Sequence, residues 1–432
     1  MKLQSKLVGF IAVVLFCLSS LVVAMLLTSA RSAVNWQQVR AVAIESDDWG
    51  LAGFTPSESS WRGVDRKSLQ TGRFPEVYWN STLEDSLIVS DLVELMTASR
   101  GRDNIAAVFQ ANYVMSSMHR DTLRDAWIEY ELPNWPPQYQ RPGIWQAIES
   151  GRAKGVWRAE HHSMFHYDPE IRRQNGMANA VAKLATERGI MLFPGSEGAR
   201  EWAPWRLESD MRNEWERSLD IFDKVFGRAP KSVIAADYTW HGWVETVWTD
   251  SDIQIIQAKR EQRNPLWTAG KWGRLQKLAD RQWTRLWHPE RIYLERNCHL
   301  EPVQAPDPQK VAASCLLETV AAWRRGEPAI VESHRVNFSH TDARVRETGL
   351  SSMREYLGAV TSLEPKPTFL CDSEIAQLSR RGTSWRRFGD KIVLRNLTHG
   401  TRVVVVPSED GGKSGQRIYR LAGGEVQIIK EP

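Results

Sequence analysis

Apolar runs of strand length alternate with amphipathic segments from about Val39 to Cys371. Eight runs have the length and composition of buried strands: VRAVAIES, NIAAVFQANYV, KGVWRAEHH, GIMLFPG, KSVIAAD, DIQIIQA, RIYLERN and PAIVESHR. Between several of them apolar residues recur with a helical period: DSLIVSDLVELM, MANAVAKLATERG, NEWERSLDIFDKVFG and QKVAASCLLETVAAW. Repeated strand and helix units predict a parallel sheet of the α/β class, and seven or eight strands favour a (β/α) barrel over an open sheet.

After Cys371 the pattern changes to short strands. A helix-like segment leads into four apolar runs separated by Gly-rich or Asn-containing turns: DKIVLRNL, TRVVVVPS, QRIYRLA and EVQIIKEP. We therefore expect a barrel over residues 36–375 and a small all-β module over residues 379–432.

The positive charge of the chain is concentrated in this module. Residues 379–432 hold 11 Lys and Arg and five Asp and Glu, a net +6, whereas the whole chain carries +4. Such a surface suits acidic glycans or anionic headgroups, or it is a solvated β-face that resists edge aggregation. No nucleic-acid-binding motif accompanies it, and we expect no nucleic-acid partner.

The first residues form a separate segment. No charged residue occurs from Leu7 to Ala30, and Lys2 and Lys6 precede this stretch. Its length exceeds the roughly 7–15 residues of a signal-peptide core and is close to the roughly 20 that span a bilayer. We expect residues 1–33 to anchor the protein in a membrane, with the rest facing the periplasm or cell surface. The alternative is a signal segment that is cleaved after Ala30, which would give a secreted protein.

Cysteine and tryptophan usage narrows the class of protein. Three cysteines follow the N-terminal segment and none forms a Cys-x-x-Cys pair, so neither a disulfide framework nor a zinc ribbon is expected. The chain holds 20 Trp, a side chain that suits both a large core and stacking against sugar rings. The candidates for stacking in loops are Trp49, Trp135, Trp202, Trp205 and Trp240.

Polar residues end nearly every predicted strand of the barrel. In (β/α) barrels the chemistry gathers at the carboxyl ends of the strands. The polar residues found there are Asp47, Asp48, Gln110, Asn112, Glu160, His161, His162, Asp237, Gln257, Arg296, Asn297, His334 and Arg335. The concentration of His and Asp among them predicts a site at this rim.

The sequence HSMFH places His162 and His166 four residues apart, which on a helical turn puts both imidazoles on one face. Asp48, at another strand end, supplies a third ligand for one metal ion and leaves positions open for water and substrate. We favour His162 over its neighbour His161 as the ligand. A histidine pair in the core or on the surface is the alternative.

Three segments resemble the NodB-type polysaccharide deacetylase family. SDDWG is similar to the family's Asp-Asp-Gly motif with one residue inserted, HSMFH matches its His-[Ser/Thr]-x-x-His motif, and SHRVNF resembles the late strand that carries a catalytic His. The resemblance covers roughly Val39 to Cys371. It implies a deacetylase-type barrel and a divalent metal, with zinc the favoured ion.

The resemblance also implies roles for five residues. Asp47 would be the general base, Asp48, His162 and His166 the metal ligands, and His334 the general acid. The family's third motif carries an Arg that orients the base, but Ile234 or Ala235 stands at that place here. Arg296 or Arg335 is the expected substitute.

Further rim residues have expected roles, each with an alternative. We expect substrate contacts from Gln110, Asn112, Asp237, Tyr238 and Arg335. The two amides would otherwise satisfy backbone groups, and Asp237 and Tyr238 would cap the following helix. Glu160 is expected to hydrogen-bond a ligand imidazole as a carboxylate outside the metal-ligand set, or else to pair with Arg158 or another cation.

The sequence therefore predicts a metal-dependent hydrolase that removes acetyl groups from an exported or cell-surface polysaccharide, in particular an N-acetylated one. One alternative is a non-catalytic glycan-binding protein on the same barrel, which the missing motif Arg favours. An iron oxygenase with two His and one carboxylate uses the same ligand set. A glycosidase would have to recruit Glu160 or Asp237 as a second, separate carboxylate.

Overall fold

The structure is a computed structural model, and it describes residues 17, 19–20, 32–69, 76–191, 201–203, 205–259, 287–408 and 415–431. The anchor or signal segment expected over residues 1–33 lies outside these ranges, apart from its last two residues and three isolated positions. Within the described ranges no helix has both the length and the hydropathy needed to cross a bilayer.

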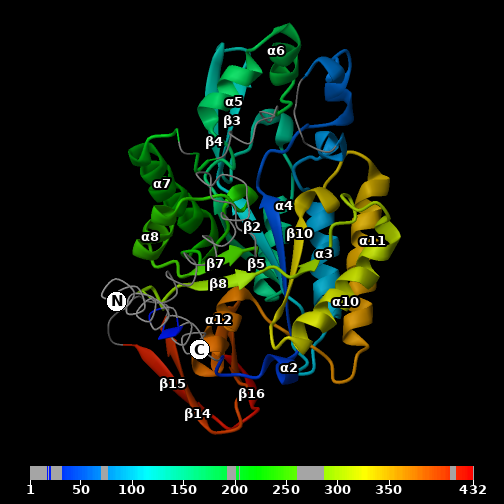
Figure 1. Ribbon diagram of the computed structural model, residues 1–432. Coiled ribbons are helices and arrows are strands. Elements are labelled where there is room, and N and C mark those ends of the chain that lie inside the picture. Colours follow the sequence, from blue (N-terminus) through cyan, green and yellow to red (C-terminus); the bar gives the residue numbers. More distant parts are fainter. Residues whose placement is uncertain are drawn as a thin grey trace, which may run out of the picture.

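A curled sheet of parallel strands forms the centre of the fold (Figure 1). Its order is β8-β7-β6-β5-β2-β1-β10-β9, with β11 also paired to β1. The strands are β1 (Ala41–Trp49), β2 (Phe109–Val114), β5 (Trp157–Ser163), β6 (Ser232–Val233), β7 (Ile255–Ala258), β8 (Ile292–Glu295), β9 (Cys298–His299), β10 (Ala329–His334) and β11 (Thr368–Phe369). The edge strands β8 and β9 do not pair with each other in the described part of the chain, so the predicted deacetylase-type barrel has the form of a curled half-barrel.

Helices connect the strands and cover the sheet. They are α2 (Trp36–Val39), α3 (Ser86–Ala98), α4 (Ile144–Ala153), α5 (Pro169–Gly176), α6 (Ala180–Glu187), α7 (Glu208–Phe226), α8 (Gly242–Asp250), α10 (Val311–Arg324), α11 (Ala343–Thr361) and α12 (Asp372–Arg381). Helices α3, α10 and α11 lie side by side along one flank, and α7 and α8 lie near the β7–β8 end (Figure 1).

The four helices predicted from the 3.6-residue period are confirmed as α3, α6, α7 and α10. Their ends follow from local chemistry. The side chain of Asp85 accepts a hydrogen bond of 2.9 Å from the Ile88 amide and so caps the start of α3. Gly227 ends α7 in the left-handed conformation, with φ of 64°, which costs glycine no side-chain clash.

The strand predictions are confirmed for seven of the eight runs. In GIMLFPG, the described residues 189–191 form no strand, and residues 192–195 lie outside the described ranges. The sequence reading missed β9, β11, β12 (Thr383–Phe388) and a hairpin of β3 (Ser116–Asp121) and β4 (Ala126–Glu131). The strands β9 and β11 are two residues long, and a segment of that length has no measurable period.

The C-terminal strands form a small two-layer unit. One layer is β12 (Thr383–Phe388), β13 (Lys391–Asn396) and β16 (Val426–Lys430), and the other is β14 (Arg402–Pro407) and β15 (Gln416–Leu421). Helix α12 joins this unit to the half-barrel. The buried carboxylate of Glu374 on α12 pairs with Arg386 and Arg395 of the strands, and Arg395 also pairs with Asp103 of the half-barrel. Charged contacts thus tie the unit to the sheet.

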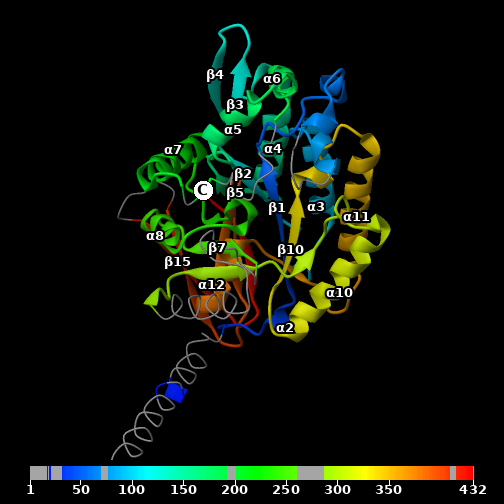
Figure 2. The same cartoon turned by 45° about the horizontal axis from the view of Figure 1, so that its top comes forward.

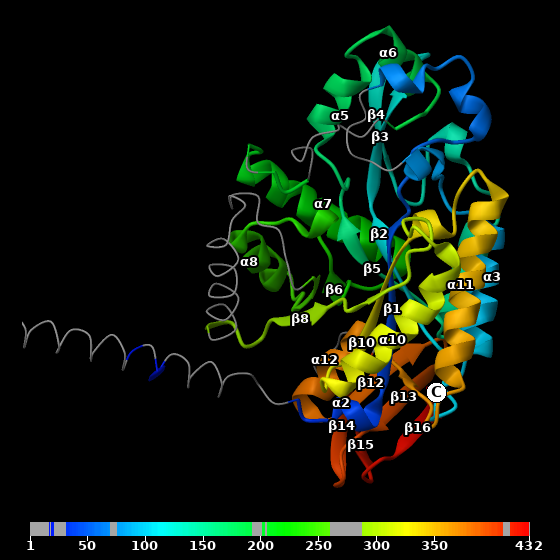
Figure 3. The ribbon, with the colours of Figure 1, turned by 45° about the vertical axis from the view of Figure 1, so that its right-hand side comes forward.

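The two ends of the half-barrel differ. The β3–β4 hairpin, α5 and α6 lie together beyond the carboxyl ends of the strands (Figure 2). The C-terminal unit lies at the opposite end (Figure 3). The rim on which the predicted site residues lie is therefore the one remote from the basic strands.

Candidate metal centre

The end of β1 departs from regular strand geometry at its two aspartates. One extra residue of β1 is accommodated between Ser46 and Trp49 in the pairing with β2, and Asp48 has a left-handed φ of 69°. Neighbouring side chains of a regular strand point to opposite faces. The bulge instead places both Asp47 and Asp48 at the rim.

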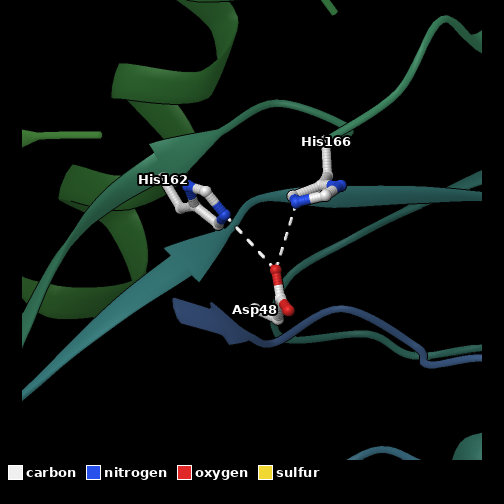
Figure 4. Close-up of side chains that lie close together, drawn as sticks. All are labelled: Asp48, His162 and His166. Carbon is white, nitrogen blue, oxygen red and sulfur yellow. Dashed lines mark ion pairs between the residues drawn. The ribbon is translucent and has the colours of Figure 1, made fainter. Parts of the chain in front are cut away.

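Asp48 faces two histidines at the carboxyl end of β5, one within the strand and one after it (Figure 4). Its Oδ1 atom lies 3.3 Å from Nε2 of His162 and 3.1 Å from Nε2 of His166. His162 lies near the end of β5. His166 follows it across a short turn and has a left-handed φ of 70°. The structure thus brings together the three residues expected to hold a metal ion.

The chemistry of these donor atoms fits a divalent cation. Nδ1 of His162 lies 3.0 Å from the carbonyl oxygen of Ile234, which only accepts hydrogen bonds, so Nδ1 carries the proton and Nε2 presents its lone pair to Asp48. Apart from their close approach to each other, neither Asp48 Oδ1 nor His162 Nε2 has a hydrogen-bond partner among the described residues, and both atoms are buried. Atoms bound at about 2.0–2.1 Å to one ion at tetrahedral angles lie about 3.3 Å apart, close to the distances found here.

The electrostatic environment between Asp48, His162 and His166 also favours a positive charge. Burial alone would lower the pKa of His162, but the hydrogen bond and charge of Asp48 and the charge of Asp47 raise it. The carboxylate and imidazoles therefore attract either protons or a metal ion. Within the described residues one other group of acidic and His side chains is close enough to bind a cation: Glu301, Glu332 and His334. Lys259 already neutralises Glu332 there, with Nζ 2.7 Å from Oε1.

Asp47 is held by Arg296, which lies after β8 and not at the position of the third motif, where Ile234 or Ala235 stands. Arg296 follows β8, and its Nη1 and Nη2 atoms donate to the two carboxylate oxygens of Asp47 at 2.6 and 2.7 Å. Burial alone would raise the pKa of Asp47, but the charge and hydrogen bonds of Arg296 hold it far below its ordinary value. Asp47 is ionised and oriented, as a general base must be.

Of the two arginines expected to orient Asp47, Arg296 and Arg335, the structure places Arg296 against its carboxylate. Arg335, the other candidate, is buried away from Asp47 and donates to the carbonyl oxygen of Leu51 and to Glu84. The expected substrate contact of Arg335 is wrong for the same reason. Its guanidinium has no exposed surface with which to reach a substrate.

His334 lies across the rim from the metal-ligand group. Its Nε2 atom is 3.8 Å from Oδ2 of Asp47, and its Nδ1 atom is hydrogen-bonded to Glu301. Burial alone would lower the pKa of His334, but the charge and hydrogen bond of Glu301, with the charges of Asp47 and Asp48, raise it to about 10. His334 is thus protonated near neutral pH and can donate a proton. Glu301 was missed from the sequence because it follows the two-residue strand β9.

Two of the amides expected to bind substrate are interior residues. Gln110 donates to Asp372 at 2.6 Å, and Asn112 donates to Asp47 and to Gln257 at 2.8 Å each. Both are buried, so the prediction of substrate contact is wrong for them. Their polar groups are satisfied inside the sheet, and Asn112 adds a second support for the Asp47 carboxylate.

Glu160 and His161 point away from the metal-ligand group. Glu160 pairs with Arg158 and Arg228 at 2.8 and 3.1 Å, which is the alternative considered for it, and the expected bond to a ligand imidazole is not formed. His161 bonds Ser218 on α7 through Nε2 at 2.8 Å. The alternation of a strand explains the direction of His161, since its neighbour His162 faces the rim.

Asp237 and Tyr238 do lie at the rim. Both have left-handed φ values, 56° and 54°, which are strained for residues other than glycine. The Tyr238 hydroxyl donates to Glu332 at 2.7 Å and accepts from Arg296 at 3.0 Å. Tyr238 thus joins the network around the base, and Asp237 is exposed.

Of the loop tryptophans proposed for stacking, Trp49, Trp135, Trp202 and Trp240 are buried in the core. Trp205 alone among these five is exposed, at 52%. Its indole N–H donates to Asp168 at 3.0 Å, two residues beyond His166. An exposed aromatic face therefore lies beside the metal-ligand turn.

Comparisons with protein-family models and with curated proteins find no match. Solved structures do match. The chain resembles polysaccharide deacetylases. The carbohydrate deacetylase Agd3 is 10% identical over 92% of this chain and 65% of its own, with a TM-score of 0.40. The Bc1960 peptidoglycan N-acetylglucosamine deacetylase is 10% identical over 78% of this chain and 89% of its own, with a TM-score of 0.29.

Another match is Puue allantoinase, which is 10% identical over 79% of this chain and 90% of its own, with a TM-score of 0.43. The three TM-scores lie below 0.5, so the functional conclusion rests on the residues of the site itself.

Proposed function

We propose that this protein is a metal-dependent hydrolase that removes acetyl groups from a polysaccharide, most directly from N-acetylated sugar units. The observation that carries the proposal is the grouping of Asp48, His162 and His166 beside a base, Asp47, that Arg296 keeps ionised. His334 completes the set as a protonated group on the other side of Asp47.

The side chains divide the reaction between them. A divalent ion held by Asp48, His162 and His166, with zinc the favoured ion, would polarise the acetyl carbonyl and lower the pKa of a bound water. Asp47 accepts the proton of the attacking water, and Arg296 and Asn112 fix the carboxylate while it does so. His334 donates its Nε2 proton to the leaving amine, and Glu301 on Nδ1 stabilises the imidazolium.

The exposed side chain of Trp205 is a reason to expect a polymeric substrate. An exposed indole beside the metal-ligand turn offers a flat apolar face to a sugar ring next to the one that loses its acetyl group. We expect Trp205→Ala to raise KM for a sugar hexamer about tenfold and to leave turnover of an acetylated monosaccharide unchanged. Trp287 is the matched control, because it is exposed but precedes β8 at the amino end of the strand.

The non-catalytic alternative loses its main support. It was favoured because the third motif lacks an Arg, but Arg296 holds Asp47 from another strand. A glycosidase would need a second carboxylate at the rim. Glu160 is buried in ion pairs with Arg158 and Arg228, which leaves the exposed Asp237 as the remaining candidate, whereas the metal-ligand group is already complete. The geometry therefore favours hydrolysis of an acyl group.

We also propose that the protein acts outside the cytoplasm, on exported or cell-surface glycan. The uncharged stretch from Leu7 to Ala30, preceded by Lys2 and Lys6, supports an anchor or a signal segment. Protease accessibility of the C-terminal strands in cells whose outer envelope has been removed tests this placement. Protection while the cytoplasmic membrane is intact, together with cleavage after lysis, would contradict it.

The experiment that tests the function measures acetate release from N-acetylglucosamine oligomers by the full chain in detergent. Release should stop when a chelator removes the metal and return when zinc is added. Asp47→Asn should retain zinc without turnover, and His166→Ala should lose zinc. Stoichiometric metal binding without hydrolysis of any N- or O-acetylated glycan would contradict the proposal and favour glycan binding.

A further inference from the structure

The turn between the two histidine ligands is held by a carboxylate from a distant segment. Oε1 of Glu201 accepts hydrogen bonds from the backbone amides of Met164 and Phe165, at 2.7 and 3.2 Å. These two residues lie between His162 and His166. The backbone amide of Ser116 on β3 also donates to the carbonyl oxygen of Met164, at 2.8 Å.

The turn needs this support because its conformation is unfavourable on its own. His166 has a left-handed φ of 70°, which β-carbon crowding disfavours in L-residues. The amides of Met164 and Phe165 are buried with their side chains and would lack partners without Glu201. Within the described ranges, Glu201 is the sole side chain that accepts from them.

Glu201 is itself fixed and buried. Its side chain is 3% exposed. Arg206 donates to the carbonyl oxygen of Glu201 at 2.8 Å and to the neighbouring carboxylate of Glu214 at 2.6 Å. The Glu201 carboxylate is thus presented to the turn by a braced segment.

We infer that Glu201 is a positioning residue for the metal centre. It holds the turn so that the imidazoles of His162 and His166 already face Asp48 when an ion binds. This inference rests on the proposed metal-dependent function. It assigns Glu201 no contact with the substrate or the ion, and its effect is on metal affinity.

The test measures zinc affinity by competition with a chromophoric chelator, on the full chain at pH 8.5. Burial and the charge of Glu214 raise the pKa of Glu201 to about 7, so the carboxyl is ionised at that pH. We expect Glu201→Leu to weaken zinc binding about 10- to 100-fold, the usual loss when support for a metal ligand is removed. Glu201→Gln keeps an acceptor oxygen and should bind zinc within about threefold of the parent.

Glu214→Leu is the matched control, because Glu214 lies beside Glu201 and does not contact the turn. It should keep the parent's zinc affinity. Thermal unfolding provides a second readout: in Glu201→Leu the shift produced by adding zinc should shrink, beyond any change in the metal-free protein. If Glu201 had only a structural role, the substitution would lower the unfolding temperatures of the metal-free and the zinc-bound protein equally.

Three outcomes would overturn the inference. Parental zinc affinity in Glu201→Leu would do so, and an equal loss in Glu214→Leu would show general loosening of the segment. Absence of zinc binding by the parent would overturn this inference and the metal-dependent function together. Parental zinc binding without acetate release would contradict the proposed function alone.

Discussion

Asp47 and Asp48 are neighbours in the chain, but their carboxylates have different partners. Asp48 faces the imidazoles of His162 and His166, while Asp47 receives two hydrogen bonds from Arg296. The bulge in β1 allows this division, because both side chains reach the rim without competing for the same partner. Two adjacent residues can therefore take the two proposed roles, Asp48 as metal ligand and Asp47 as base.

Arg296→Lys tests the orientation of the base. Lysine keeps a positive charge but cannot donate two parallel hydrogen bonds to Asp47. We expect kcat to fall about 100-fold, as for other small misplacements of a catalytic group, with zinc content unchanged. Arg335→Lys is the control, since Arg335 contacts Glu84 and Leu51, and it should leave kcat within about threefold. Equal kcat values in Arg296→Lys and the parent would show that Asp47 is oriented otherwise.

Glu301→Gln tests the proton donor through the pH profile of kcat/KM. Activity requires protonated His334, so it is present below the pKa of His334 and lost as the pH rises through it. Glu301 contributes to the raised pKa of about 10. Removing its charge should lower that pKa and shift the alkaline limb downward by about one to three pH units. An unchanged alkaline limb would exclude His334 as the group that sets it.

At the scale of elements, β1 ends in a turn directly after Asp48 and Trp49, and Gly50 permits that turn. Gly50 has φ of 78°, and a β-carbon there would lie 2.9 Å from the carbonyl oxygen of Val114. Gly50→Ala should cost about 1–2 kcal/mol for the left-handed conformation and a further 1–3 kcal/mol for crowding, and it should weaken zinc binding. Urea unfolding and zinc titration measure the two effects.

Gly63→Ala is the matched control for that substitution. Gly63 has φ of 74°, but no atom of the described residues lies within 4 Å of the β-carbon position. The Gly63→Ala variant should lose only the roughly 1–2 kcal/mol of unfolding free energy that the left-handed conformation costs, and it should keep full zinc affinity. Equal losses in the two variants would show that the space around Gly50 is not restrictive.

The elements also show how far the sequence predicts this fold. Periodicity identifies seven strands and four helices, because these segments bury a continuous face. The two histidines and Asp48 are found because strand ends and four-residue spacing bring them to one rim. Glu301 and Glu201 are not found, since one follows a two-residue strand and the other acts on backbone amides, which leave no residue pattern.

At the scale of the whole molecule, the C-terminal strands and the half-barrel should unfold together. Glu374 is buried between Arg386 and Arg395, so its charge is compensated only while both units are packed. We expect Glu374→Gln to lower the free energy of unfolding by about 3–5 kcal/mol in one urea transition, seen alike by circular dichroism and tryptophan fluorescence. Asp390→Asn, which breaks the exposed pair with Lys430, should change stability little. Two separate transitions would contradict this coupling.

The central claim is that one metal ion binds between Asp48, His162 and His166. Anomalous scattering from a zinc-soaked crystal tests it most directly. We predict one strong peak about 2.0–2.2 Å from Asp48 Oδ1 and from the Nε2 atoms of both histidines. A peak between Glu301, Glu332 and His334, with none at Asp48, would contradict the account, because it would make His334 a ligand instead of the proton donor.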